Sequence, residues 1–335
     1  MLPSVRPTQV GFLLAALASM FALGCGEHAP DPWEGAVGKK IMVSFPPLHS
    51  FVSNVAGEHA TVKVLLDNTG VHDYQASPRD AGKLHKADIF FYNGLELDDT
   101  FAVALLRNSA NPGLKERTYA VGKAIPQDRL LKMAEHEHVH DAKDGGACAG
   151  CGHKHGEFDP HIWLGVPEAI LMVEYIRDRL KENDPSHAAD YDTNAARYIE
   201  KLRKLHADGL AKFTSKQNKK FVPSHESLSY FARCFHVEAM KPLQRLPGED
   251  PSSARMQDIV KRCQQENVRV IAVEPGQIVN NTGKVLLNEL KVKGVADPQI
   301  VEIDVLESAS ANELKPDFYE RKLAENIDKL AQALR

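Results

Sequence analysis

The chain has 335 residues, enough for one large domain or two ordinary ones. Hydrophobic residues make up 43% of it and charged residues 26%, the range of a globular protein with a sizeable core. The formal net charge of -4 excludes the broad positive field that binding of nucleic acid or of an anionic membrane surface requires. Histidine is unusually frequent, because there are 15 and six of them fall between His136 and His161.

The N-terminus has the layout of an export signal. Arg6 precedes an apolar run over residues 11–23, which is short for a membrane-spanning helix. We therefore predict a signal peptide over residues 1–24. The sequence Ala-Leu-Gly-Cys that ends at Cys25 resembles a bacterial lipoprotein cleavage box and predicts lipidation of Cys25, with an ordinary cleaved signal as the alternative. Residues 25–39 contain Gly, Pro and acidic residues and are predicted to be a flexible tether.

From residue 40 onward, short apolar runs alternate with helix-like segments. The predicted strands of the first half are residues 41–45, 62–66, 87–92 and 119–121. Those of the second half are residues 221–222, 268–273 and 299–303, followed by an amphipathic C-terminal helix over residues 316–334. Such alternation predicts parallel sheets flanked by helices.

A long helical region separates the two series of strands. After Asp184-Pro185, which favours a helix start, apolar residues keep helical spacing to about residue 208. We predict an α/β fold of two lobes, each a mostly parallel sheet flanked by helices, joined by a long rigid helix. The boundaries are an N-terminal lobe at 40–183, a linking helix at 184–214 and a C-terminal lobe at 215–335. Two consecutive helices of one larger domain are the alternative.

Four metal-capable side chains are expected at strand-end turns of the two halves. His72 follows the strand 62–66, His161 precedes a helix, His225 follows the strand 221–222, and Asp304 follows the strand 299–303. In α/β sheets this edge is where ligands bind. Three imidazoles and a carboxylate suit zinc at ~2.0–2.2 Å, whereas manganese favours more oxygen ligands. We therefore expect these four residues to bind Zn2+, with Mn2+ as the alternative.

Three nearby acidic residues are candidates for orienting the ligands. Glu274 follows the strand 268–273, and Asp73 and Asp159 lie close in sequence to His72 and His161. Alternatively, all three are ordinary acidic residues of loops that contact no ligand.

The chain resembles the metal-specific solute-binding proteins of ABC transporters, most closely their zinc-binding branch. The resemblance runs from about Lys40 to the C-terminus. It rests on His72-Asp73-Tyr74 with Pro78 and Asp80, on His161-Ile162-Trp163-Leu164, on His225 with Tyr230-Phe231, on Glu274-Pro275 and on Asp304. It implies metal held in a cleft between two lobes, with His72 and His161 from the first lobe and His225 and Asp304 from the second.

The resemblance also implies a function. We expect an exported, periplasmic or cell-surface monomer that captures Zn2+ and delivers it to the permease of an ABC transporter in the cytoplasmic membrane. Only a lipid anchor would attach it to the membrane. A manganese- or iron-binding relative and a metal-dependent adhesin are the alternatives. An enzyme such as a zinc hydrolase is not expected, because catalytic zinc usually keeps an open position and no motif supplies a nucleophile or general base.

A histidine-rich insert is predicted at residues 135–155 of the first lobe. Its metal-capable side chains are His136, His138, His140, Cys148, Cys151, His153 and His155. Several glycines and the lack of apolar periodicity favour a flexible loop that collects metal weakly, with a disordered loop of incidental affinity as the alternative. Cys148 and Cys151 could bind zinc if reduced or form a disulfide if oxidised. Cys234 and Cys263 could pair in an exported protein or remain buried thiols.

Overall fold

The computed structural model describes residues 31–66, 70–72, 74–133, 157–244, 250–275 and 281–335. The chain divides into two units, Met1–Glu34 and Gly35–Arg335, and the second holds the elements described below. The predicted signal peptide with Cys25, Asp73, and the insert at 135–155 lie outside the described residues. Within the described ranges, no helix is both long and apolar enough to cross a bilayer.

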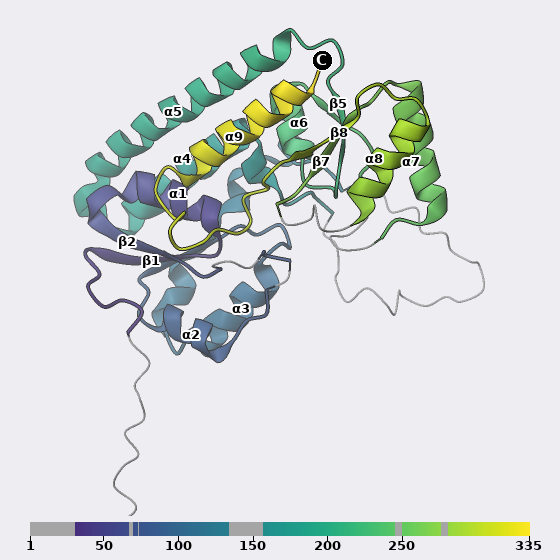
Figure 1. The fold of residues 1–335 in the computed structure, drawn as a ribbon. Coiled ribbons are helices and arrows are strands. Elements are labelled where there is room, and N and C mark those ends of the chain that lie inside the picture. The colour runs from purple at the N-terminus through teal and green to yellow at the C-terminus, as the bar shows by residue number, and fades with distance from the viewer. Residues whose placement is uncertain (1–30, 67–69, 73, 134–156, 245–249, 276–280) are drawn as a thin grey trace, which may run out of the picture. The chain divides into compact units, whose positions relative to one another are not determined.

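Two parallel sheets of four strands each form the framework of the second unit (Figure 1). The first sheet has the order β2-β1-β3-β4 and comprises β1 (Lys39–Val43), β2 (Ala60–Val64), β3 (Ile89–Tyr92) and β4 (Thr118–Ala120). The second has the order β6-β5-β7-β8 and comprises β5 (Lys220–Pro223), β6 (Glu238–Ala239), β7 (Val270–Val273) and β8 (Gln299–Glu302). The expected fold class, with one mostly parallel sheet in each half, is confirmed. The sequence did not predict β6, since two residues carry no periodic signal.

Helices connect the parallel strands, as such crossovers require. They are α1 (Pro46–Ala56), α2 (Pro78–His85), α3 (Asp99–Asn108), α4 (Val166–Asn183), α5 (Ala188–Thr214), α6 (Ser229–Phe235), α7 (Ser253–Gln265), α8 (Asn281–Val292) and α9 (Phe318–Ala333). The short 3-10 helix η5 (Ile162–Leu164) precedes α4. Proline at the first turn of α1, α2 and α4 favours these starts, because its fixed φ suits a helix and its missing N–H leaves no donor unsatisfied.

The long helix α5, of 27 residues, runs from the first half to the second. It contacts α1 and α4 of the first half, and α6 and α9 of the second. Figure 1 shows α9 (yellow) lying along α5 (teal). Close approach occurs at Gly209, where a Cβ atom would lie 2.5 Å from the Phe235 ring. A glycine is therefore required for α5 to pack this tightly on α6.

One hydrophobic core extends through both halves of this unit. Trp163, which follows His161, and Tyr319 of α9 belong to the same buried cluster as Phe221 of β5. A second, smaller cluster covers the other face of the second sheet and includes Val222 and Ile271. Because packed cores deform little, the shared cluster opposes a wide hinge motion between the halves.

Cys234 and Cys263 are both buried and free. They belong to different core clusters, Cys234 to the shared one and Cys263 to the smaller one. Burial raises the pKa of each thiol to about 12, so both remain protonated and unreactive at neutral pH. Of the two possibilities considered for Cys234 and Cys263, the structure shows buried free thiols and no disulfide between them.

Candidate metal centre

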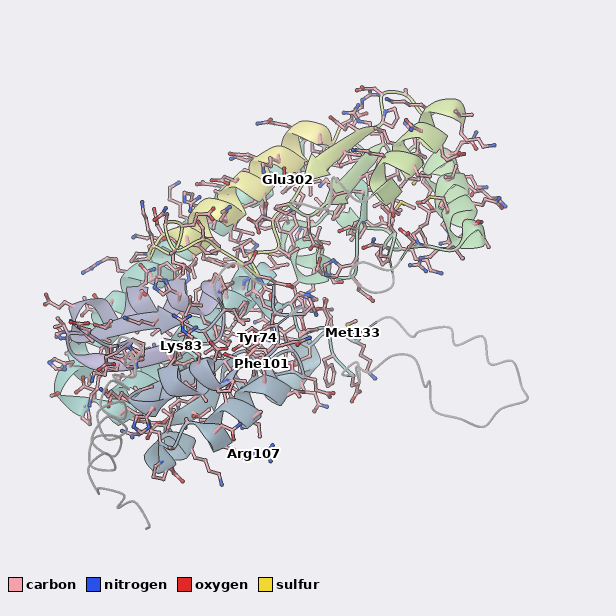
Figure 2. The ribbon with its side chains drawn as sticks, turned by 60° about the horizontal axis from the view of Figure 1, so that its bottom comes forward. Tyr74, Lys83, Phe101, Arg107, Met133 and Glu302 are labelled. Carbon is pink, nitrogen blue, oxygen red and sulfur yellow. The ribbon has the colours of Figure 1, made fainter. Side chains whose placement is uncertain are left out.

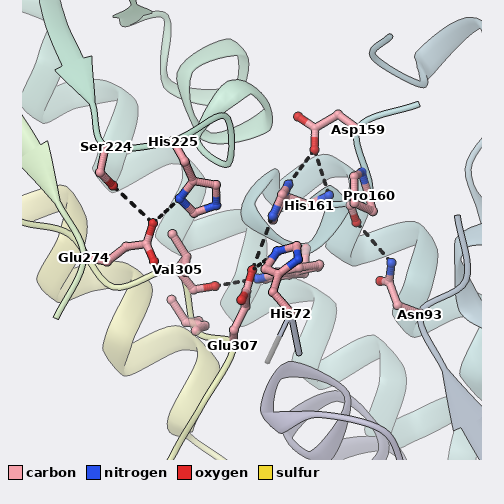
Figure 3. Close-up of polar contacts among 12 residues, drawn as sticks. His72, Asn93, Asp159, Pro160, His161, Ser224, His225, Glu274, Val305 and Glu307 are labelled. Carbon is pink, nitrogen blue, oxygen red and sulfur yellow. Dashed lines mark hydrogen bonds and ion pairs between the residues drawn. The ribbon is translucent and has the colours of Figure 1, made fainter. Parts of the chain in front are cut away.

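Three histidines and one glutamate converge between the two halves of the Gly35–Arg335 unit (Figure 3). They are His72, His161, His225 and Glu307, and one candidate ligand atom from each lies within 4.8 Å of all the others. Within the part of the chain that the structure describes, this is the group of metal-capable side chains that could hold an ion. The three histidines singled out in the sequence are therefore brought together. The expected carboxylate, Asp304, is not among them.

The spacing of these atoms suits a tetrahedral ion. The His72, His161 and His225 ring centroids lie 5.7–6.1 Å apart. Oε1 of Glu307 lies 3.4 Å from Nε2 of His72 and 3.3 Å from Nε2 of His161. Four ligands at ~2.0–2.1 Å from a tetrahedral zinc ion are themselves about 3.3–3.4 Å apart. The two contacts of Glu307 therefore have the separation expected of neighbouring ligands.

Burial leaves several atoms of the group without hydrogen bonds. His161 and His225 are 3% and 4% exposed, and the side chain of Glu307 is 9% exposed. Nε2 of both histidines and Oε1 of Glu307 have no hydrogen-bond partner. A buried polar atom without a partner is costly, and a bound cation would satisfy all three. The His72 side chain is 35% exposed, so the group opens to solvent on its side.

His72 follows β2 in the chain, and the residues from Tyr74 onward are fixed by packing and by a helix cap. Tyr74 packs edge to face on Phe101 of α3, with ring centroids 4.7 Å apart (Figure 2). Beyond it, Ser77 and Asp80 form a capping box at the start of α2. Here the hydroxyl of Ser77 donates to Asp80, and the Asp80 amide donates back to it. The chain is therefore anchored at Tyr74 and at the start of α2, close in sequence to His72.

Asp159 orients His161. Its Oδ1 accepts hydrogen bonds from Nδ1 of His161 at 2.7 Å and from the backbone N–H of His161 at 2.9 Å. Asn93, at the end of β3, donates from its amide to the carbonyl of Pro160 at 3.1 Å. With Nδ1 donated to Asp159, Nε2 is the nitrogen that faces the other three residues of the group and is available to a metal ion. This is the orienting role expected for Asp159.

The chain on either side of residues 134–156 is joined into a stem that reaches the same site. Lys132 and Phe158 pair in an antiparallel bridge, and the N–H of Asp159 donates to the carbonyl of Leu131. The N–H of Leu131 in turn donates to the hydroxyl of Tyr230 on α6. His161 thus receives its partner Asp159 from the base of the predicted insert.

Glu274 has the corresponding place beside His225. It follows β7, and its carboxylate forms an ion pair with Nδ1 of His225 and accepts a hydrogen bond from the Ser224 hydroxyl at 3.2 Å. Nε2 of His225 is consequently the nitrogen directed at the group (Figure 3). Glu274 contacts a candidate ligand and is not itself in the group.

Asp304 is corrected to a structural role. Its Oδ2 lies 3.0 Å from Nζ of Lys322 on α9, and its Oδ1 accepts a hydrogen bond from the N–H of Leu306 at 2.8 Å. Both oxygens are therefore used within its own loop and by α9. Glu307, three residues further along the same loop, is the carboxylate that lies among the histidines. The expectation that ligands follow the ends of strands identified the correct loop, after β8. It chose Asp304, the first acidic residue of that loop, whereas Glu307 lies among the histidines.

Neighbouring carboxylates keep the His161 imidazole protonated in the absence of metal. Burial alone would lower the pKa of His161, but the carboxylates of Asp159 and Glu307 outweigh it and raise this pKa to about 10. Burial would likewise raise the pKa of Glu307, but His72 and His161 hold it below its usual range. The metal-free group is therefore a charged pair of imidazolium and carboxylate. A metal ion that binds His161 must release its proton.

Comparisons with known proteins find zinc-binding relatives. The chain is 29% identical over 331 residues to a zinc-binding lipoprotein, AdcA, of Streptococcus pneumoniae, a match that covers 97% of this chain. It spans about 60% of the length of that relative. The Zn(II)-bound ZnuA-like domain of the same AdcA has a TM-score of 0.66 at 27% identity, over 89% of this chain and 99% of that domain.

The fold is shared with other metal-binding proteins. FpvC of Pseudomonas aeruginosa, solved in complex with Mn2+, has a TM-score of 0.69 at 22% identity over 89% of this chain and 98% of its own. At that identity the likeness concerns the fold. The family profile described as zinc-uptake complex component A, periplasmic (ZnuA), matches residues 41–333, which include the whole histidine and glutamate group and both sheets except the first two residues of β1. The chain therefore belongs to the ZnuA family of solute-binding components, which are not enzymes.

Proposed function

We propose that this chain captures Zn2+ through His72, His161, His225 and Glu307 and delivers it to the permease of an ABC transporter. The observation that carries the proposal is the spacing of Glu307 from two imidazoles, 3.3 and 3.4 Å, which is that of adjacent ligands on a tetrahedral ion. The metal is cargo. His72, the exposed member, is the ligand through which the ion enters and leaves.

Three imidazoles and one carboxylate favour zinc over manganese, because manganese prefers more oxygen ligands. The named relative AdcA is a zinc-binding lipoprotein, whereas FpvC was solved with Mn2+. Manganese is therefore the competitor to measure against. The orienting carboxylates Asp159 and Glu274 raise the basicity of two imidazoles, which supports tight binding of a borderline-soft ion.

The proposal includes export and a lipid anchor at Cys25. It is supported by the signal-like N-terminus and by the description of AdcA as a lipoprotein. Metabolic labelling with a fatty-acid analogue tests it. We expect the wild type to be labelled and a Cys25→Ser variant to be released from the membrane fraction. Equal labelling of both would disprove the anchor.

Competitive titration of the chelator-stripped protein tests the zinc site directly. We expect one tight site, a preference for Zn2+ over Mn2+, and release of a proton on binding at pH 7.5, since His161 is protonated without metal. His161→Ala should weaken zinc binding by at least about tenfold. His85→Ala is the control, because that ring is bonded to the Ser109 carbonyl, outside the group.

Wild-type affinity in all three of His72→Ala, His161→Ala and His225→Ala would show that the site is wrong. Tight binding of Mn2+ in preference to Zn2+ would keep the site and change the cargo. Delivery to a permease is tested separately, by growth on scarce zinc. We expect loss of growth in a deletion strain and its recovery with the wild-type gene but not with the His161→Ala gene.

A further inference from the structure

The loop that carries Glu307 is closed at both ends by a single lysine. Lys322 of α9 places its Nζ 3.0 Å from Oδ2 of Asp304 and 3.1 Å from Oε1 of Glu313. These two carboxylates stand three residues before and six residues after Glu307. The side chain of Lys322 is 17% exposed, so the pairs are partly shielded from water and salt.

Each carboxylate also organises its own end of the loop. Oδ1 of Asp304 accepts a hydrogen bond from the N–H of Leu306. Oε2 of Glu313 accepts from the hydroxyl and the N–H of Ser310, at 2.8 and 3.1 Å. The contacts with Ser310, and then that with Lys322, lower the pKa of Glu313 to about 2. Both carboxylates are therefore already hydrogen-bonded within the loop where Lys322 contacts them.

Leu306, immediately before Glu307, has a left-handed backbone with φ of +65°. A leucine adopts this conformation only where its surroundings impose it, and such strain clusters at ligand-binding sites. Here Leu306 is fully buried, and its N–H is held by Asp304. The chain bends at Leu306 and Glu307, so the left-handed residue immediately precedes the candidate ligand. The direction of the Glu307 side chain therefore depends on Asp304 remaining in place.

The backbone around Asp304 is fixed from two further directions. Asn326, fully buried on α9, accepts from the N–H of Asp304 and donates to its carbonyl at 2.9 and 2.6 Å. The indole of Trp163 donates to the carbonyl of Val305 at 2.9 Å. These bonds fix the start of the loop, but none of them neutralises the charge of Asp304 or reaches Glu313. Lys322 does both.

We propose that Lys322 is a positioning residue that keeps Glu307 on the metal and keeps Asp304 and Glu313 off it. This inference rests on the proposed zinc site. Without the ammonium group, two carboxylates would stand uncompensated in the groove that Glu307 and His72 also line. They would repel each other, loosen the loop and compete for the cation with oxygen ligands. Oxygen-rich coordination favours manganese, so Lys322 also maintains the preference for zinc.

The test compares Lys322→Met with Lys329→Met in the metal-stripped, full-length mature protein. Lys329 is on the same helix and lines the same groove, so the control removes an equal charge. We expect Lys322→Met to weaken zinc binding about 10–100-fold, the usual effect of removing a group that orients a ligand, and to narrow the ratio of Zn2+ to Mn2+ affinity. Lys329→Met should stay within about threefold, as expected for a surface charge. Lys322→Arg, which retains the cation, should restore most of the affinity.

Two readouts separate positioning from general loss of stability. In a double-mutant cycle with Glu307→Gln, Lys322→Met should have little further effect, because the carboxylate that it positions is gone. The visible spectrum of bound Co2+ should lose the intensity typical of tetrahedral coordination in Lys322→Met but not in Lys329→Met. If Lys322→Met does not fold, Glu313→Gln, which removes one of the two ion pairs, should show the same change at smaller size.

Equal zinc affinities of the Lys322→Met and Lys329→Met proteins would overturn the inference, and so would full additivity with Glu307→Gln. Tight binding by the wild type together with an unaffected Lys322→Met variant would overturn it alone and leave the proposed function standing. A wild type without a tight zinc site would overturn both.

Discussion

Two matched substitutions, Glu307→Gln and Asp304→Asn, test which carboxylate binds the metal. Each replaces a carboxylate by an amide of the same size. Both residues lie in the loop between β8 and α9. Oε1 of Glu307 is buried, has no hydrogen bond and lies within 3.4 Å of two imidazole nitrogens. Both oxygens of Asp304 are occupied by Lys322 and Leu306. Glu307→Gln should therefore weaken zinc binding far more than Asp304→Asn.

The expected difference in zinc affinity follows from the share of the binding free energy that each ligand contributes. Four-ligand zinc sites in small folding domains bind with roughly 10–16 kcal/mol, so one ligand contributes about 2.5–4 kcal/mol on average. An amide oxygen remains a weak donor, which places Glu307→Gln near the lower end, at a loss of about 100-fold. Asp304→Asn keeps an oxygen for the N–H of Leu306 and loses only the ion pair with Lys322. We expect it to cost about tenfold.

The assay is competition with a chromophoric chelator at pH 7.5, with urea unfolding of the metal-free proteins to confirm that both variants are folded. Proton release gives a second readout, since the Glu307 carboxylate helps to raise the pKa of His161 to about 10. Glu307→Gln should therefore reduce the number of protons released on zinc binding. A loss in Asp304→Asn equal to or larger than that in Glu307→Gln would refute the assignment of the carboxylate ligand.

Three further predictions concern the surroundings of the site and the rest of the chain. Glu274→Gln should weaken zinc binding about 10–100-fold by releasing Nδ1 of His225, and an unchanged affinity in calorimetry would exclude an orienting role. Burial would raise the pKa of Asp184, but His187 and its other hydrogen-bond donors lower it to about 2, below the ordinary 3.8. Its contribution to stability is therefore present above pH ~4 and lost as the pH falls through 2. Asp184→Asn should lose up to about 2 kcal/mol of unfolding free energy at pH 6 and flatten the acid side of the stability profile, and a parallel shift at all pH values would contradict this. Deleting residues 135–155 should lower zinc stoichiometry and leave the tightest site intact, because the sequence predicts an insert without apolar periodicity, and ordering such a segment around metal costs free energy. Loss of the tight phase in the titration would show that the insert is part of the primary site.

Much of the fold was readable from the sequence because its signals are local. The apolar runs at 41–45 and 268–273 predicted β1 and β7, to within two residues at each end, because fully buried parallel strands carry continuous apolar residues. Helical spacing after residue 184 predicted α5. His72 and His225 follow strands, and the carboxyl ends of parallel strands share one edge of a sheet, so the sequence placed both near a ligand site.

The fourth member of the group depended on contacts that sequence spacing does not contain. Asp304 and Glu307 both follow β8, and nothing in the local pattern ranks one above the other. We infer that the choice depends on Lys322, 18 residues after Asp304 on a separate helix, and on the left-handed backbone of Leu306. On this inference, an ion pair and a left-handed bend together direct Glu307 toward the histidines. Both exist only once α9 has packed along the loop, so the sequence determined the edge of the sheet and the tertiary structure determined which carboxylate lies among the histidines.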